Sequence, residues 1–292
     1  MTGGSGTKKL CKLIYGLLLG AFLINCASME EPRNRIRVDP STLFNPNQDN
    51  DDKKNTTLGP LDTTAVALKM AEAEDAIVRG LNKQLRAKMQ PNIEKSPLAI
   101  FTFYWAIADP YERWEAFNKY KIDHRTRVIG PLGVCLTYLE WRVVEHAQKP
   151  CDFVKDKYGN ISIVEVAWGR YWEAKGDIAQ ALKHYSNAVE INGKDVSAHL
   201  AIGKIKAIKG ESAAALKAWD RSIQAWPDCF RCHKAKAQYI EEKFGLADAL
   251  PIWERVLEIA PEDTGSLTRY AKAQVGRNDD KALFAYETAL KG

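Results

Sequence analysis

The sequence predicts an all-α protein, an α-solenoid of helix hairpins preceded by additional helices. In the second half of the chain, small and aromatic residues recur at a period of 34 residues. Before that repeat, apolar residues spaced three and four apart predict amphipathic helices. A fixed period of this length is the signature of stacked hairpins, because one hairpin cannot bury its own apolar face and needs the next to cover it.

Residues 1–25 have the composition of a secretion leader. A basic start is followed by an apolar run over residues 13–23, which is shorter than the roughly 20 residues that a membrane span needs. The basic residues are Lys8, Lys9 and Lys12. Subtracting these three from the formal charge of +5 leaves +2, so the charge gives no argument for binding nucleic acid.

The leader ends Leu23-Ile24-Asn25-Cys26, which resembles the signal of bacterial lipoproteins. The resemblance implies cleavage before Cys26 and acylation of that cysteine. Ile24 and Asn25 are not the small residues usual at these places, so an ordinary cleaved signal and an uncleaved anchor stay as alternatives. Ala27 follows the cysteine, and in lipoprotein sorting this residue implies the outer membrane.

Residues 26–60 are predicted to be a lipid-anchored flexible tether. The segment is polar, interrupted by prolines and poor in aliphatic residues, so it buries too little to fold by itself. A flexible chain of this length spans on the order of 30 Å, enough to lift a domain away from a bilayer.

An N-terminal helical region is predicted for residues 61–127. Apolar residues spaced three or four apart predict one helix over residues 63–89, which Pro91 ends. Ser96-Pro97 and Asp109-Pro110 each have the form of an N-cap followed by proline at the first helical position, so two shorter helices should start there.

Residues 161–292 contain the repeat. Three sets of positions follow the period of 34, with one step of 33 at the end for the second and third sets. These are Gly169, Gly203, Ala237 and Ala271; Ala181, Ala215, Ala249 and Ala282; and Tyr185, Trp219, Trp253 and Tyr286. Small residues are needed where two helices cross closely. The aromatic residue should fill the gap to the next hairpin.

This pattern, with Pro227 and Pro261 closing two units, resembles the tetratricopeptide repeat. The resemblance implies three full repeats and a shortened fourth, each a pair of antiparallel helices. Pro251 departs from it and should be tolerated only near the start of its helix, where backbone N–H groups lack partners.

Residues 128–160 are a candidate for a further, degenerate repeat. Cys135, Tyr138 and Ala147 stand 34 residues before Gly169, Trp172 and Ala181, whereas Pro150 departs from the pattern. If this unit exists, Cys135 and Cys151 lie on facing helices and could form a disulfide.

The motif Cys229-Phe230-Arg231-Cys232-His233 has two interpretations. In an exported protein it can mark attachment of a c-type haem, with His233 as an iron ligand. Alternatively, the cysteines form a disulfide with each other or with Cys135 and Cys151. We favour a disulfide and no cofactor, because the repeat register places the motif on a linker and a first helical turn.

Catalytic and metal sites are not predicted. The sequence contains none of the local motifs of serine hydrolases, zinc proteases or P-loop enzymes. The histidines lack metal-ligand spacing, although His199 and His233 share one repeat position. We therefore expect a protein that is not an enzyme.

The resemblance implies a binding groove lined by the first helix of each repeat. The residue after the small position faces it, and three of the four such residues here are basic, which suits an acidic peptide segment. These four are Arg170, Lys204, Gln238 and Lys272, and their predicted groove neighbours are Val166, Glu173, Leu200, Lys234 and Glu241.

Together these features predict a protein-interaction scaffold of the cell envelope, anchored by lipid to the outer membrane and facing the periplasm. It would bind a segment of a partner protein, with a role in assembling an envelope complex. The alternative is a haem or thiol redox protein built on Cys229, Cys232 and His233.

Overall fold

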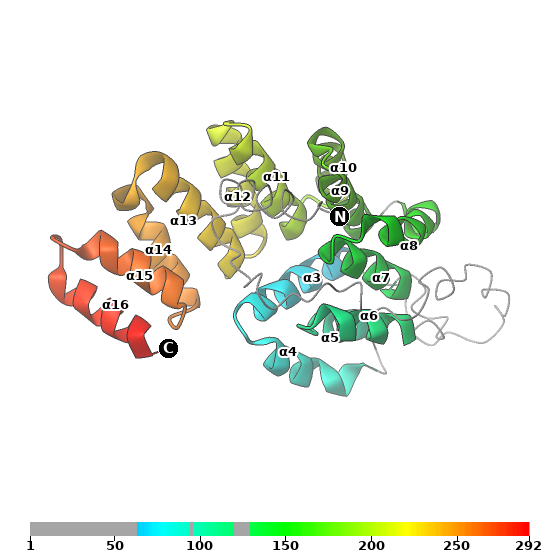
Figure 1. Ribbon diagram of the computed structural model, residues 1–292, viewed down its shortest axis with the longest axis horizontal. Coiled ribbons are helices and arrows are strands. Elements are labelled where there is room, and N and C mark those ends of the chain that lie inside the picture. Colours follow the sequence, from blue (N-terminus) through cyan, green and yellow to red (C-terminus); the bar gives the residue numbers. More distant parts are fainter. Residues whose placement is uncertain (1–62, 94–95, 120–128, 160, 292) are drawn as a thin grey trace, which may run out of the picture. The chain divides into compact units, whose positions relative to one another are not determined.

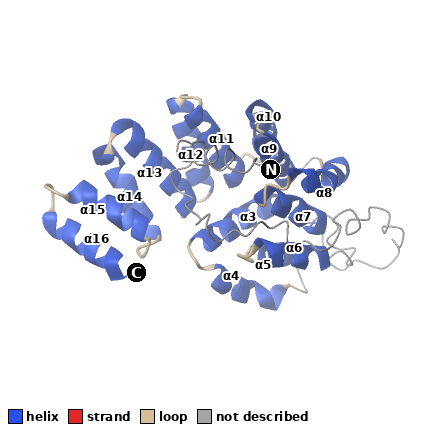
Figure 2. Cartoon of the chain, in the orientation of Figure 1, coloured by secondary structure: helices blue, strands red, loops and turns tan. Residues whose placement is uncertain are grey.

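The computed structural model describes residues 63–93, 96–119, 129–159 and 161–291. All of these belong to one compact unit, Phe44–Gly292. Within the described ranges every regular element is a helix, and the hairpins follow one another in chain order (Figures 1 and 2). The all-α solenoid fold is therefore confirmed. The predicted leader, Cys26 and the tether lie outside the described residues.

The N-terminal region forms short helices, and the prediction of one helix over residues 63–89 was wrong. The chain turns at Gly80, whose φ is +70°. The Gly80 amide donates to the Ile77 carbonyl at 3.1 Å and the Leu81 amide to that of Ala76 at 2.7 Å, which closes the first helix. The elements are α3 (Thr63–Val78), α4 (Asn82–Met89), η3 (Gln90–Asn92), α5 (Pro97–Trp105) and α6 (Pro110–Lys119).

Both predicted helix starts are confirmed. The Ser96 hydroxyl accepts a hydrogen bond from the Ala99 amide at 3.3 Å, and the Asp109 carboxylate accepts one from the Glu112 amide at 2.9 Å. Each side chain satisfies an amide that has no partner inside its helix.

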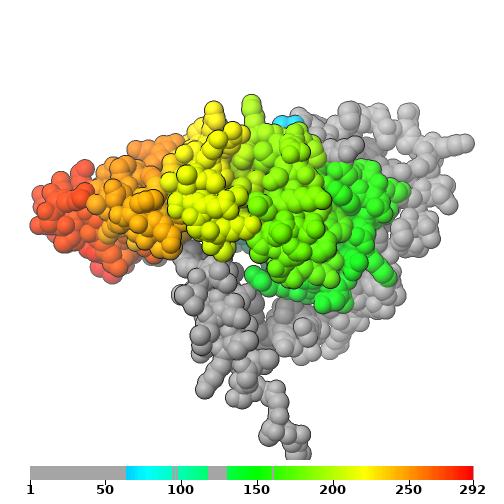
Figure 3. Space-filling model, turned by 90° about the horizontal axis from the view of Figure 1, so that it is seen from above, coloured from blue at the N-terminus to red at the C-terminus, as the bar shows by residue number. Residues whose placement is uncertain are grey.

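The remaining helices form five hairpins, and each hairpin after the first packs against the one before it (Figure 1). In Figure 3 the successive hairpins follow one another from green to red. The first is α7 (Ile129–Glu140) with α8 (Val144–Tyr158). The four repeats follow as α9 (Ser162–Lys175) with α10 (Ile178–Ile191), α11 (Val196–Ile208) with α12 (Ser212–Ala225), α13 (Phe230–Phe244) with α14 (Leu246–Ile259), and α15 (Thr264–Gln274) with α16 (Asp279–Lys291).

The hairpin of α7 and α8 lies within residues 128–160, the range predicted as a candidate degenerate repeat. A disulfide between Cys135 and Cys151 joins its two helices, and both residues are buried. Pro150 is accommodated inside α8 and is also buried. The hairpin packs against α9 and so covers the N-terminal end of the repeats.

The small-residue positions lie where the two helices of a repeat touch. A Cβ atom on Gly169 would come within 3.0 Å of the Tyr185 ring, and one on Gly203 within 3.0 Å of the Trp219 ring. The aromatic residue of the second helix therefore lies directly on the backbone of the first. In the third repeat Ala237 takes this position, packed with Trp253.

Pro251 does not lie where we expected it. It is the sixth residue of α14, inside the helix, and its side chain is exposed. An exposed position lets water bind the Ala247 carbonyl, which loses its helical partner.

Replacing Gly203 with a larger residue should destabilise the fold, because the Trp219 ring must move away from α11. We expect Gly203→Val to lower the free energy of unfolding by about 2–3 kcal/mol, measured by denaturant titration. Gly193→Val is the matched control, since its Cβ would be 3.9 Å from the nearest atom. An unchanged midpoint for the Gly203 variant would show that the ring contact does not set the hairpin spacing.

Candidate functional site

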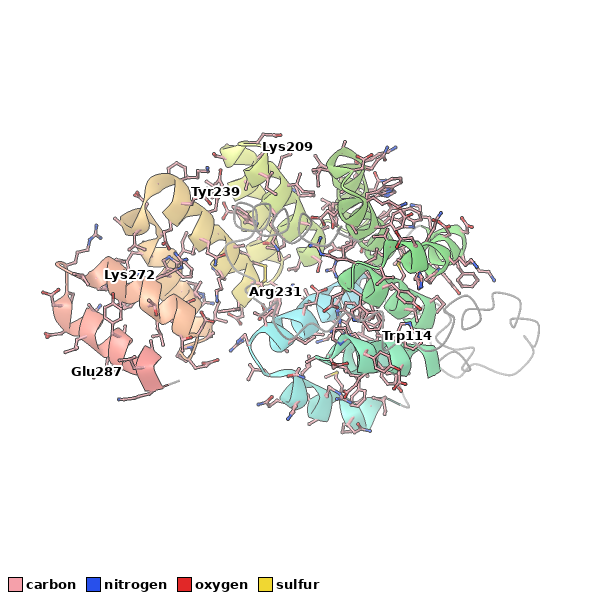
Figure 4. All side chains as sticks on the ribbon, in the orientation of Figure 1. Trp114, Lys209, Arg231, Tyr239, Lys272 and Glu287 are labelled. Atoms are coloured by element: carbon pink, nitrogen blue, oxygen red, sulfur yellow. A yellow bond between two sulfur atoms is a disulfide. The ribbon has the colours of Figure 1, made fainter. Side chains whose placement is uncertain are left out.

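The first helices of the four repeats present the residues that the sequence predicted for a binding groove. Arg170, Lys204, Gln238 and Lys272 come from α9, α11, α13 and α15 in equivalent positions. We call the surface around these four residues the first-helix face. Lys204 and Lys272 are exposed, whereas Arg170 and Gln238 are partly buried. Figure 4 labels Lys272 on α15.

The N-terminal part of the first-helix face is covered by a helix of the chain itself. Helix α3 packs against α9 and α11 and lies beside them in Figure 1. Its Ala71 is fully buried in an apolar cluster with Val196, Cys229 and Cys232, and Leu68 packs on the same cluster. The repeats therefore already hold a helix where the sequence predicted an external peptide.

Carboxylates of α3 form ion pairs with arginines of the repeats. The Glu74 carboxylate lies 2.7 Å from Nη2 of Arg170 on α9 and 2.8 Å from Nη1 of Arg231 on α13. The next residue, Asp75, accepts a hydrogen bond from the Arg231 amide at 3.0 Å, and the Arg231 side chain also donates to the Ala71 carbonyl at 3.3 Å. Arg231, labelled in Figure 4, thus contacts α3 through both its backbone and its side chain.

The pKa values of the two neighbouring carboxylates of α3 are shifted in opposite directions. Burial alone would raise the pKa of Glu74, but Arg170 and Arg231 outweigh it and hold the pKa at about 2, against an ordinary value of 4.5. Burial raises the pKa of Asp75 although Arg231 opposes this. Glu74 is therefore the main electrostatic anchor of the helix, and Asp75 is bound at a desolvation cost.

Lys204 lies next to this anchor. Its side chain reaches solvent, yet the surrounding protein lowers the pKa of its ammonium by desolvation, and the nearby Arg231 guanidinium lowers it further. A cation in this setting gains from an added carboxylate, because an opposite charge nearby offsets both effects.

Several predicted groove residues contact the repeats themselves. Val166 and Leu200 are buried and do not lie on an open surface; Leu200 packs with Trp219 and Tyr239. Lys234 forms an ion pair with Asp263 at 2.9 Å. Leu200 and Lys234 therefore contribute to the packing of successive repeats.

The two predicted glutamates bind the aromatic residues of their own hairpins. Glu173 accepts a hydrogen bond from the Tyr185 hydroxyl, and Glu241 accepts one from the Trp253 indole at 3.0 Å. Glu241 also pairs with Arg269 of the next repeat. The same arrangement thus recurs two repeats apart, which a 34-residue register could have shown.

Sequence reasoning did not find Arg231 or its partners on α3. Arg231 lies between the two cysteines, and the sequence marks it only as part of their motif. The available signal was the adjacent pair Glu74 and Asp75 within an apolar helix, since buried carboxylates need cationic partners.

The cysteine–histidine motif forms the start of α13. Cys229 and Cys232 are joined by a disulfide, and the Cys229 sulfur accepts a hydrogen bond from the Cys232 amide at 3.2 Å. The His233 ring is buried and its Nε2 donates to the Pro227 carbonyl at 2.9 Å. His199, one repeat earlier, makes the same bond to the Gly193 carbonyl at 2.9 Å, so this histidine position stabilises the turn between repeats.

Metal-ligand clusters and membrane-spanning segments are both lacking in the described helices. Among them, no three histidine, cysteine, aspartate or glutamate side chains gather as metal ligands would. None of these helices combines the length and apolar character that crossing a bilayer requires.

Glu74 should make stability depend on pH. Its pKa is lower in the folded protein than its ordinary value, so its stabilising contribution is present above about pH 4.5 and is lost as the pH falls towards about 2. We expect Glu74→Gln to cost on the order of 3 kcal/mol at pH 7, with the difference from wild type shrinking across this window.

Urea unfolding at several pH values measures this difference. Glu72→Gln is the control on the same helix, since its pairing with Lys69 is more exposed and should contribute at most about 1 kcal/mol. A Glu74→Gln variant as stable as the Glu72→Gln variant at pH 7 would contradict the assignment of Glu74 as the anchor.

Comparison with known proteins supports the fold. No protein-family model matches the chain, and no curated protein sequence does. Among solved structures, TTC0263, a thermophilic TPR protein of Thermus thermophilus, is 19% identical with a TM-score of 0.53 and matches 61% of this chain and 97% of its own. PilF of Pseudomonas aeruginosa is 14% identical with a TM-score of 0.51, over 56% and 76%. The hairpins of this chain thus have the fold of tetratricopeptide-repeat (TPR) proteins.

Proposed function

We propose that this protein is an interaction scaffold that binds a segment of a partner protein on its first-helix face and catalyses no reaction. The observation that carries the proposal is the pair of exposed lysines, Lys204 and Lys272, at equivalent positions of two repeats. Neither forms an ion pair with another side chain in the part of the chain that the structure describes. Such cations are available to carboxylates of a partner.

The contacts of α3 support the class of ligand. The same face already binds a helix, and it does so by placing guanidinium groups on carboxylates at 2.7 and 2.8 Å. An acidic partner segment would use this chemistry at the positions that α3 leaves open. In this structure Arg170 is not among the open positions, because it is paired with Glu74.

We further propose that the scaffold is tethered to the outer membrane and faces the periplasm, where it takes part in assembling an envelope complex. The support is in the sequence, namely the lipoprotein-like signal before Cys26 and the polar segment that follows. Two or three acyl chains would hold the protein on a bilayer, since each buried methylene contributes about 0.8 kcal/mol.

Charge reversal tests the proposed face. A photo-crosslinking amino acid at Gln238 in cells identifies the partner by mass spectrometry, and Lys204→Glu with Lys272→Glu should reduce the crosslinked yield about tenfold. Lys217→Glu, an exposed position on the second helix α12, is the matched control. Undiminished crosslinking by the double variant, with its circular dichroism unchanged, would remove the first-helix face from the proposal.

Substitution of Cys26 tests the anchor. Intact mass of the protein from native membranes should show acyl chains on wild type and on Cys11→Ser, whose change lies in the leader. Cys26→Ser should lack them and lose its membrane association. A mass without acyl chains on the wild-type protein would contradict the lipid anchor and leave the binding face untouched.

A further inference from the structure

The contact between α3 and the repeats has the form of a bound peptide helix. One stripe of α3, spaced by three and four residues, makes it: Leu68 and Ala71 pack on the apolar cluster, and Asp75 binds Arg231. Glu74 beside this stripe binds Arg170 and Arg231. Helix-in-groove recognition uses this arrangement of apolar residues and fixed charges.

Two arginines of the repeats hold this helix by charge, in addition to the apolar packing of its fully buried residues Val66, Ala67, Met70 and Ala73. Ala71, at the centre of the apolar contact, buries little surface because its side chain is small. The two arginines supply the electrostatic attraction, and part of it is offset by the desolvation of Asp75, whose pKa is raised by burial. Carboxylates from another helix could take up the same arginines, since nothing in the ion pairs depends on which chain supplies them.

Directly after α3, the chain makes a further contact with the repeats, a hydrogen bond from Arg79 Nη2 to the Ile259 carbonyl at 2.8 Å. Gly80 has a φ of +70° and no atom within 4 Å of a Cβ placed there, so the turn is unhindered. The following helix, α4, contains no buried residue. Helix α3 also packs against α5, which keeps it beside the repeats, where it can return to the arginines at high effective concentration.

We propose that α3 is a built-in competitor for the partner, and that the partner segment is an α-helix with two adjacent carboxylates that displaces Glu74 and Asp75 from Arg170 and Arg231. This inference rests on the proposed function and adds to it the chemistry of the partner and a self-occupied state. Binding of the external helix is then weakened by the fraction of molecules in which α3 is bound.

A labelled peptide with the sequence of residues 63–79 tests whether an external helix can displace α3. Its binding to the full chain is measured by fluorescence anisotropy. The variant with Glu74→Gln and Asp75→Asn should bind this peptide at least about tenfold more tightly than wild type, because its own helix has lost both anchors. The matched control, Lys69→Gln with Glu72→Gln, removes a more exposed ion pair of the same helix and should bind as wild type does.

Two further arms check that the peptide uses the same site. Arg231→Ala in the released variant should abolish the gain, and a peptide with glutamine and asparagine in place of its two carboxylates should bind neither protein. Equal peptide affinity for wild type and the released variant, or no binding to a released variant that is folded, would overturn the proposal.

Hydrogen exchange on the unmodified protein keeps the test independent of the variants. The amides of α3 should exchange faster than those of α11, which lies inside the repeats. Equal protection of the two helices would show that α3 is a fixed part of the core. Helix α3 could be equally protected while reversing the charge of Lys204 and Lys272 still reduces crosslinking. In that case the proposed displacement of α3 is wrong, and the scaffold function is still supported.

Discussion

The close approach of the two helices within each repeat is the constraint on which the rest of the structure depends. The Tyr185 and Trp219 rings lie directly on the backbones at Gly169 and Gly203, where a Cβ would come within 3.0 Å of each ring. This contact sets how closely the two helices of one hairpin approach, because a Cβ at the glycine would overlap the ring. Fixed hairpin geometry in turn places the residue after each small position on one common surface, the first-helix face.

The second determinant is the ion-pair cluster that joins the N-terminal helices to the repeats. Glu74 satisfies two arginines from different repeats, so a single carboxylate links α9 and α13 through α3. A buried ion pair contributes less to stability than its Coulomb energy suggests, because desolvation offsets much of the attraction. Its effect on specificity is clearer: it selects a helix with a carboxylate at one place, and it divides the face into an occupied part and an open part.

The residues of the cysteine–histidine motif each make structural contacts in the fold. Cys229, Cys232 and His233 match a haem-attachment signal in spacing. In the fold the cysteines form a disulfide at a helix start, and His233 donates to a turn carbonyl as His199 does one repeat earlier. Arg231 lies between the two cysteines, at a position where the motif allows any residue. It binds α3 through both its backbone and its side chain.

The sequence by itself determined the repeat architecture, the helix starts at Ser96 and Asp109, and the common register of Arg170, Lys204, Gln238 and Lys272. These features depend on local spacing and on contacts between neighbouring hairpins, which a periodic sequence records directly. Only the tertiary structure decided that α3 ends at Gly80, that Val166 and Leu200 are buried, and that Glu74 meets Arg170 and Arg231. Glu74 and Arg170 are 96 positions apart along the chain, and Arg231 lies further still. A contact over that separation leaves no period in one sequence, and the geometry of the folded chain creates it.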